Sequence, residues 1–187
     1  SGNTIGKEVF VMNGGKIVVP NGGQALSISK GKATINDGEV IVNKVPGGSG
    51  WNTVVYANGA LEITGGKFFG TVGNWGTISI SGGTFSYPDD PNDGFRNEHL
   101  ADGYFTVENV DGSLTVTNDA SKLPVDENGF VIVSNYTQLL AALEVDNAKV
   151  IMANDITATA GTETGYGKAG VVLNVGDILD GDGHKLT

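Results

Sequence analysis

The chain of 187 residues has no cysteine, a single arginine and only 17% charged side chains. Without cysteine it can form neither disulfides, nor thiolate metal sites, nor a cysteine nucleophile. Its net charge of −10 argues against binding to the phosphates of nucleic acids or to anionic membrane surfaces. No apolar run approaches the roughly 18 residues that a membrane span needs, so we expect no membrane insertion.

Glycine is the abundant residue, with 30 copies in the chain, which is about twice its usual share. Valine, isoleucine and threonine are spread along the whole sequence, and hydrophobic residues make up 39% of it. Frequent glycine together with β-branched residues is typical of strands joined by tight turns. The composition therefore predicts an all-β protein.

A short motif recurs as "MNGGKI" from residue 12, "INDGEV" from 35, "ITGGKF" from 63 and "ISGGTF" from 80. Self-similarity at a period of about 20 residues is typical of a solenoid. The alternation of side chains along strands predicts that Ile35, Ile63 and Ile80 occupy equivalent inward positions and stack in one buried column. Phe68 and Phe85 close the repeated unit and are assigned to the core. The glycines fit corners that need a positive φ or close approach of backbones.

These residues resemble the I-x-G-G-x-F coils of right-handed parallel β-helices in bacterial surface proteins and some phage fibres, over roughly 5–118. We expect coils of such a solenoid over 1–118, ending in a β-hairpin at 103–116. There the pair Asp111-Gly112 favours a tight turn. Residues 119–130 contain Pro, Asp, Asn and Gly, so they are interpreted as a linker or long loop.

The pattern changes at residues 131–187, where a strand, a helix and further strands are expected. Tyr136, Leu139, Leu140 and Leu143 fall on one helical face, and Ser134 or Asn135 can cap that helix. This segment, with its "GDGHKLT" turn, resembles the N-terminal cap and first coil of pectate-lyase-like β-helices. The predicted fold is therefore all-β, a right-handed parallel β-helix with a C-terminal segment resembling a cap that contains one amphipathic helix. That segment would also begin a second β-helix.

Four aromatic residues are candidates for carbohydrate binding: Trp51, Tyr56, Trp75 and Tyr87. They lie at or near predicted corners, and exposed aromatic faces stack on sugar rings. Trp51 and Trp75 are about one repeat apart in the sequence, so both side chains could lie on the same side of the solenoid. In the alternative interpretation these two tryptophans pack beneath loops.

The resemblance to polysaccharide lyases implies proton abstraction by a basic residue, often with a Ca²⁺ ion held by acidic side chains. Asp89, Asp90 and Asp93 near Arg96 could form a calcium loop or a solvated turn. His99 and His184 show no metal-ligand spacing, and no pair of carboxylates stands out. We therefore assign no catalytic residue, no metal ligand and no cofactor.

The sequence favours an extracellular or cell-surface module, structural or adhesive, from a bacterial surface protein (an adhesin) or a phage fibre. Weak binding to a polysaccharide or host glycan is the expected activity. The alternative is a polysaccharide-degrading lyase or glycoside hydrolase, which needs a concave site with converging acids and a base. Strand edges at both ends predict end-to-end self-association, with "GDGHKLT" meeting "NTIGKEVF" of a neighbour.

Overall fold

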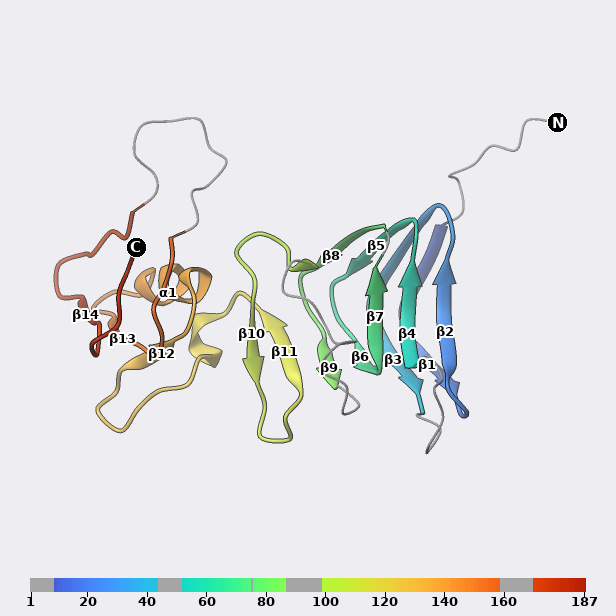
Figure 1. The fold of residues 1–187 in the computed structure, drawn as a ribbon, viewed down its shortest axis with the longest axis horizontal. Coiled ribbons are helices and arrows are strands. Elements are labelled where there is room, and N and C mark those ends of the chain that lie inside the picture. The colour runs from blue at the N-terminus through green and yellow to red at the C-terminus, as the bar shows by residue number, and fades with distance from the viewer. Residues whose placement is uncertain (1–8, 44–51, 75, 87–98, 159–169) are drawn as a thin grey trace. The chain divides into compact units, whose positions relative to one another are not determined.

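The computed structural model describes residues 9–43, 52–74, 76–86, 99–158 and 170–187 (Figure 1). The chain divides into two compact units, Ser1–Thr117 and Asn118–Thr187. The first unit contains β1 (Val9–Val19), β2 (Gly23–Ile28), β3 (Lys32–Val42), β4 (Asn52–Ala57), β5 (Ala60–Ile63), β6 (Lys67–Phe69), β7 (Thr71–Asn74), β8 (Thr77–Ile80), β9 (Thr84–Ser86), β10 (Phe105–Glu108) and β11 (Leu114–Thr117). The second contains a 3-10 helix (Ala120–Lys122), β12 (Val131–Val133), α1 (Tyr136–Leu143), β13 (Lys149–Met152) and β14 (Ile178–Asp180).

An eight-stranded sheet dominates the first unit. The long strand β3 pairs in parallel with β1, and its two halves pair with the short strands β5 and β6. Strand β8 then adds to β5, and β9 adds to β6, again in parallel. A separate sheet of β2, β4 and β7 lies alongside (Figure 1). Apolar side chains from both sheets meet in one core.

The predicted right-handed parallel β-helix is wrong, because the main sheet is mixed and curves as a half-barrel. β11 pairs antiparallel with β9, and β10 pairs antiparallel with β11. The physical reason lies in the hairpin: Asp111-Gly112 turns the chain back, and the returning strand joins the exposed edge of β9. The repeat motif describes only the pairing between neighbouring repeats and carries no information about the strand that ends the sheet.

The expected column of isoleucines is confirmed. Ile35 is the register partner of Ile63, and Ile63 is the partner of Ile80. All three side chains are fully buried. Phe68 and Phe85 are also register partners in the core, as expected. Burying a large aliphatic or aromatic side chain contributes about 1.5–3 kcal/mol, so these rows supply much of the unit's stability.

The two glycines of a Gly-Gly pair meet two different structural requirements. A Cβ atom on Gly82 would clash with the backbone oxygen of Thr64 in the neighbouring repeat. Gly83 adopts a φ of +100°, which is a conformation that side-chain-bearing residues rarely take. Both expected roles, close approach and positive φ, therefore occur within one Gly-Gly pair.

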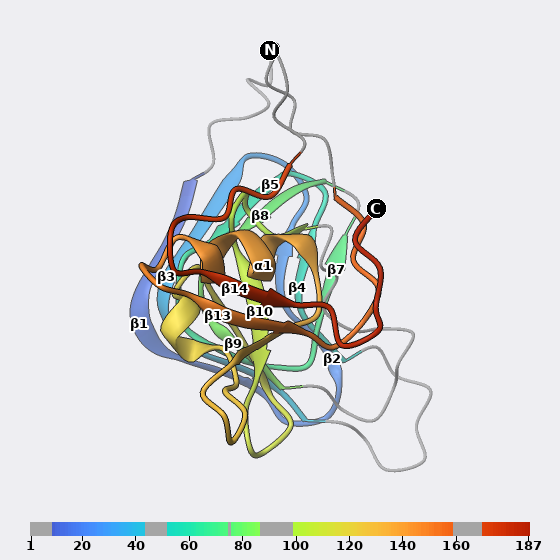
Figure 2. The same ribbon diagram turned by 90° about the vertical axis from the view of Figure 1, so that its left-hand side faces the viewer.

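The second unit is built on a parallel sheet of β12, β13 and β14. The helix α1 packs beside this sheet (Figure 2). Val133, Leu139, Val150 and Ile156 are buried in the core of this unit. Within the described residues, no helix is long and apolar enough to span a membrane.

The predicted helix is confirmed, with one difference on its apolar face. Asn135 is the N-cap, and its side chain accepts a hydrogen bond of 3.0 Å from the backbone N–H of Gln138. Gln138 Oε1 accepts from the backbone N–H of Ser134 at 2.8 Å. Leu139 and Leu143 are buried as expected, but Leu140 is exposed because the sheet covers a narrower stripe of the helix.

Candidate functional site

The first unit carries an open groove of about 770 Å³ on the outer face of the main sheet. Its lining comes from three strands and the turn between β10 and β11. We call it the Phe69 groove and define it by Lys67, Phe69, Thr84, Ser86, Asn109, Val110, Asp111, Ser113 and Thr115.

The floor of the groove follows from the side-chain alternation along β6 and β9. Phe68 and Phe85 point inward and stack in the core. The residues beside them, Lys67 and Phe69 on β6, therefore point outward. Phe69 is 39% exposed. An aromatic face of this kind, held on a rigid strand, is a flat apolar platform open to solvent.

The wall of the groove is a chain of hydrogen-bonded polar side chains. Thr84 and Thr115 share a hydrogen bond of 3.2 Å between their hydroxyl oxygens. Asn109 donates from Nδ2 to Thr115 Oγ1 and to Ser113 Oγ, at 2.9 Å each. Ser113 Oγ in turn donates to Asp111 Oδ1 at 2.6 Å. These bonds hold the polar groups in fixed positions before any ligand arrives.

Asp111 is the acidic group of the groove. Hydrogen bonds from the hydroxyl and the backbone N–H of Ser113 lower the pKa of Asp111 below its ordinary value. Hydrogen bonds to the charged form stabilise it. Asp111 is therefore a carboxylate at neutral pH, and Oδ1 receives both bonds from Ser113. Asp111 is exposed, so its carboxylate can also accept hydrogen bonds from the hydroxyl groups of a ligand.

A positive group completes the groove. Lys67 neighbours Glu39 in register, and Glu39 forms an ion pair of 2.8 Å with Lys16. The Lys16 ammonium lowers the pKa of Glu39, and Lys67 contributes more weakly in the same direction. The groove thus offers one apolar ring, one carboxylate, one ammonium and several hydroxyl and amide groups. This combination suits a ligand with a flat apolar face and a rim of hydroxyls.

Of the four aromatic residues proposed from the sequence, the structure describes only Tyr56. Trp51, Trp75 and Tyr87 lie outside the described residues, and their role in sugar binding remains a prediction. Tyr56 belongs to β4, where it is the register partner of Ser27 and Gly73. The loop with Asp89, Asp90 and Asp93 also lies outside the described residues.

Sequence reasoning missed the groove, although two signals were present. In "GGKFFG" the second phenylalanine is out of phase with the inward Phe68, so alternation places Phe69 outside. The turn has polar side chains at every second position, Asn109, Asp111 and Ser113. Only the antiparallel pairing of β11 with β9 brings that turn beside Phe69.

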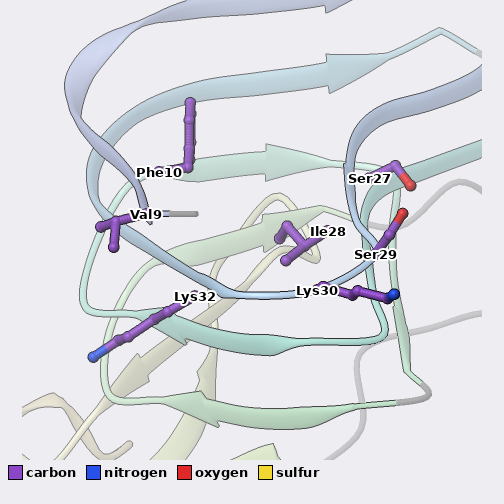
Figure 3. A pocket seen from close by; sticks show the side chains of 7 residues that line it. All are labelled: Val9, Phe10, Ser27, Ile28, Ser29, Lys30 and Lys32. Carbon is purple, nitrogen blue, oxygen red and sulfur yellow. The ribbon is translucent and has the colours of Figure 1, made fainter. Parts of the chain in front are cut away.

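The described residues contain no group of three or more His, Asp or Glu side chains placed to hold a metal ion. His184 Nδ1 lies 3.4 Å from Asp155 Oδ1, at the surface of the second unit. A second hollow, of about 400 Å³, lies beside β1 and is lined by Val9, Phe10, Ser27, Ile28, Ser29, Lys30 and Lys32 (Figure 3).

Comparison of the chain with protein-family models, with curated proteins and with solved structures gave no match.

Proposed function

We propose that this chain is a carbohydrate-binding module of an extracellular or cell-surface protein, with a structural and adhesive role. The observation that carries the proposal is the placement of the exposed ring of Phe69 beside the hydrogen-bonded side chains of Asn109, Asp111 and Ser113. Sugar rings present an apolar face and a rim of hydroxyl groups. An aromatic platform next to fixed acceptors and donors matches both features.

The rigidity of the site supports adhesion as the role. The ring stands on a three-residue strand between β3 and β9, and the polar wall is tied to the same sheet through Thr84 and Thr115. A preorganised site loses little conformational entropy on binding. A weak ligand such as a polysaccharide can therefore be held without closure of a loop.

The polysaccharide-degrading alternative requires more than this groove provides. Glycoside hydrolysis uses two carboxyl groups that flank the scissile bond, about 5–10 Å apart. Among the described residues that line the groove, Asp111 is the only carboxylate. Prolonged incubation with any bound polysaccharide, followed by assays for reducing ends and for unsaturated products, separates the two functions. We expect no product to accumulate above the level of a heat-denatured control.

The test begins with a glycan array, followed by calorimetry on the best ligand. Replacing Phe69 with alanine should weaken binding at least about tenfold, which corresponds to about 1.4 kcal/mol. Asp111→Asn should weaken the same interaction, because an amide replaces one acceptor oxygen by a donor.

Val18 provides the matched control. Val18 is the register partner of Ile41, and Ile41 is the register partner of Phe69, so the three residues form one outward row. Val18 is exposed, but it does not line the groove. Val18→Ala should leave glycan binding unchanged. Equal affinities of wild type and Phe69→Ala for the array's best ligand would contradict the proposed site.

A further inference from the structure

Strand β1 has an open edge. It is eleven residues long and pairs on one side with β3, and no other described strand pairs with it. Natural proteins usually protect such edges with charges, prolines or covering loops. The first seven residues of β1, "VFVMNGG", contain no charged residue and no proline. This edge is a template for another strand.

The inward side of this edge is also uncovered. Phe10 is the register partner of Ala33, which in turn pairs with Leu61. Ala33 and Leu61 are buried, but Phe10 is 40% exposed although it occupies the same inward row. A core position is exposed here because none of the described strands lies beyond β1. One additional parallel strand would bury the ring.

A hollow marks the place where that strand would lie. Figure 3 shows Val9 and Phe10 on one side of it and the segment from Ser27 to Lys30 on another. Ile28 is half-buried, whereas Val55 and Val72, in the deeper strands of the same sheet, are buried. The hollow is therefore the open end of the core that the two sheets share.

The second unit also has an edge strand, β14, that could pair with another strand. Among the described strands, β14 pairs only with β13, and its inward Leu179 is half-buried beside the fully buried Val150. Leu186, the bridge partner of the buried Ile156, is 40% exposed. Here too a parallel set of strands has an uncovered edge with incompletely buried inward residues.

The charges at the two edges have opposite sign. Lys30 and Lys32 flank the hollow at β1, and Lys32 is paired with Glu62, which leaves Lys30 as the basic group there. The region around β14 holds the acids Asp177, Asp180 and Asp182 and the bases Lys149 and Lys185, so acidic side chains predominate there. Opposite charges favour the orientation in which one edge meets the other, and like charges disfavour pairing of an edge with itself.

We propose that the β1 edge of one copy of this chain binds the β14 edge of a second copy, by addition of parallel strands. The apolar occupant of the hollow is the segment of the second copy around Ile178 and Leu179. Such a contact is heterologous, so each copy retains one free edge of each kind, and the association continues into larger assemblies.

Light scattering of the purified 187-residue chain over a wide range of concentrations tests the contact. The weight-average mass should exceed that of one chain and rise with concentration. Phe10→Lys removes the apolar ring from the inward row and places a charge where Leu179 of the second copy would pack, so it should return the mass to that of one chain. Ile178→Lys, at the exposed opposite edge, should do the same. Val145→Lys adds a lysine at an exposed site outside both edges and should leave the association intact.

A mixture of the two blocked variants gives the decisive measurement. Each variant keeps one working edge, so an equimolar mixture of Phe10→Lys and Ile178→Lys should form a species of two chains and nothing larger. Circular dichroism checks the fold of each variant, and Val9→Lys, at a site that is 71% exposed, replaces Phe10→Lys if that variant does not fold.

Three results would overturn the proposal. The first is a wild-type mass of one chain at every concentration, which would mean that other parts of the chain cover the edges. The second is loss of association in Phe10→Lys but not in Ile178→Lys, which would show that two β1 edges pair with each other. The third is an equimolar mixture of the folded variants that stays at the mass of one chain.

Discussion

The ring of Phe68 lies against the ring of Phe85 with 4.9 Å between centroids and an angle of 9° between planes. The two residues occupy the same position in successive repeats, and β6 and β9 place them in register. Stacking of side chains one strand apart converts a sequence repeat into a continuous row in the core. Phe85→Ala should therefore lower the free energy of unfolding by about 3–5 kcal/mol, measured by chemical denaturation.

Ser86→Ala is the control for that experiment. Ser86 follows Phe85 on β9 and points to the outer face, so its loss removes little buried area. A loss of stability in Ser86→Ala as large as that in Phe85→Ala would contradict the assignment of inward and outward positions.

Ile63 is the centre of the isoleucine column. Ile63→Asp should unfold the first unit or destabilise it by several kcal/mol, because a carboxylate buried without a partner loses its hydration. Thermal melting with circular dichroism measures this effect. Thr77→Asp introduces the same group at an exposed position of β8, and it should melt close to the wild-type temperature. A wild-type melting curve for Ile63→Asp would refute the register of the repeats.

Gly82 tests the close approach between neighbouring repeats. A Cβ atom at this position meets the carbonyl group of Thr64, which belongs to rigid backbone. Gly82→Ala should therefore destabilise the protein by about 1–3 kcal/mol in a urea titration. Gly170 has open space around its Cα and no positive φ, so Gly170→Ala should change stability little. Similar midpoints for both alanine variants would show that the backbones separate without cost.

Asn135 tests the capping of α1. Its side-chain oxygen accepts the N–H of Gln138, and replacement of such a cap by alanine costs about 1 kcal/mol. Asn135→Ala should lower the stability of the second unit by that amount, whereas Asn135→Asp should retain most of the wild-type stability. Hydrogen exchange at the amides of the first helical turn reports the change directly. Unchanged protection in Asn135→Ala would exclude the cap as a stabilising contact.

Ser113 controls the ionisation of Asp111. The two hydrogen bonds from Ser113 lower the pKa of this carboxyl, so the charged form is favoured in the folded state. The associated stabilisation is present above the ordinary pKa of aspartate and is lost as the pH falls through the lowered value. Ser113→Ala should raise the pKa of Asp111 toward its ordinary value, observed by NMR titration of the carboxyl carbon.

Asp119 serves as an internal reference in the same spectra. Hydrogen bonds from Ser121 lower the pKa of Asp119 independently, so its titration should not change in Ser113→Ala. If Asp111 binds sugar hydroxyls as a carboxylate, the low-pH limit of glycan binding should move upward together with the pKa of Asp111. A Ser113→Ala variant in which Asp111 titrates as in the wild type would contradict the described hydrogen bonds.

The amino-acid sequence by itself determined the local features of this protein. The recurring Ile-x-Gly-Gly pattern determined which residues are inward, since alternation along a strand depends only on the backbone geometry. It therefore predicted the column of Ile35, Ile63 and Ile80 and the positions of the glycines. The spacing of Leu139 and Leu143 and the cap at Asn135 likewise defined α1, because these interactions join residues only a few positions apart.

Only the tertiary structure decided how the main sheet ends and where the groove lies. Residues 109–115 are separated from Phe69 by about two repeats of chain, and no local pattern states which edge the returning strand joins. Antiparallel pairing of β11 with β9 makes the sheet mixed and carries Asn109, Asp111 and Ser113 to the exposed ring. The predicted β-helix failed at this pairing, because the choice between strand edges depends on long-range packing and not on residue periodicity.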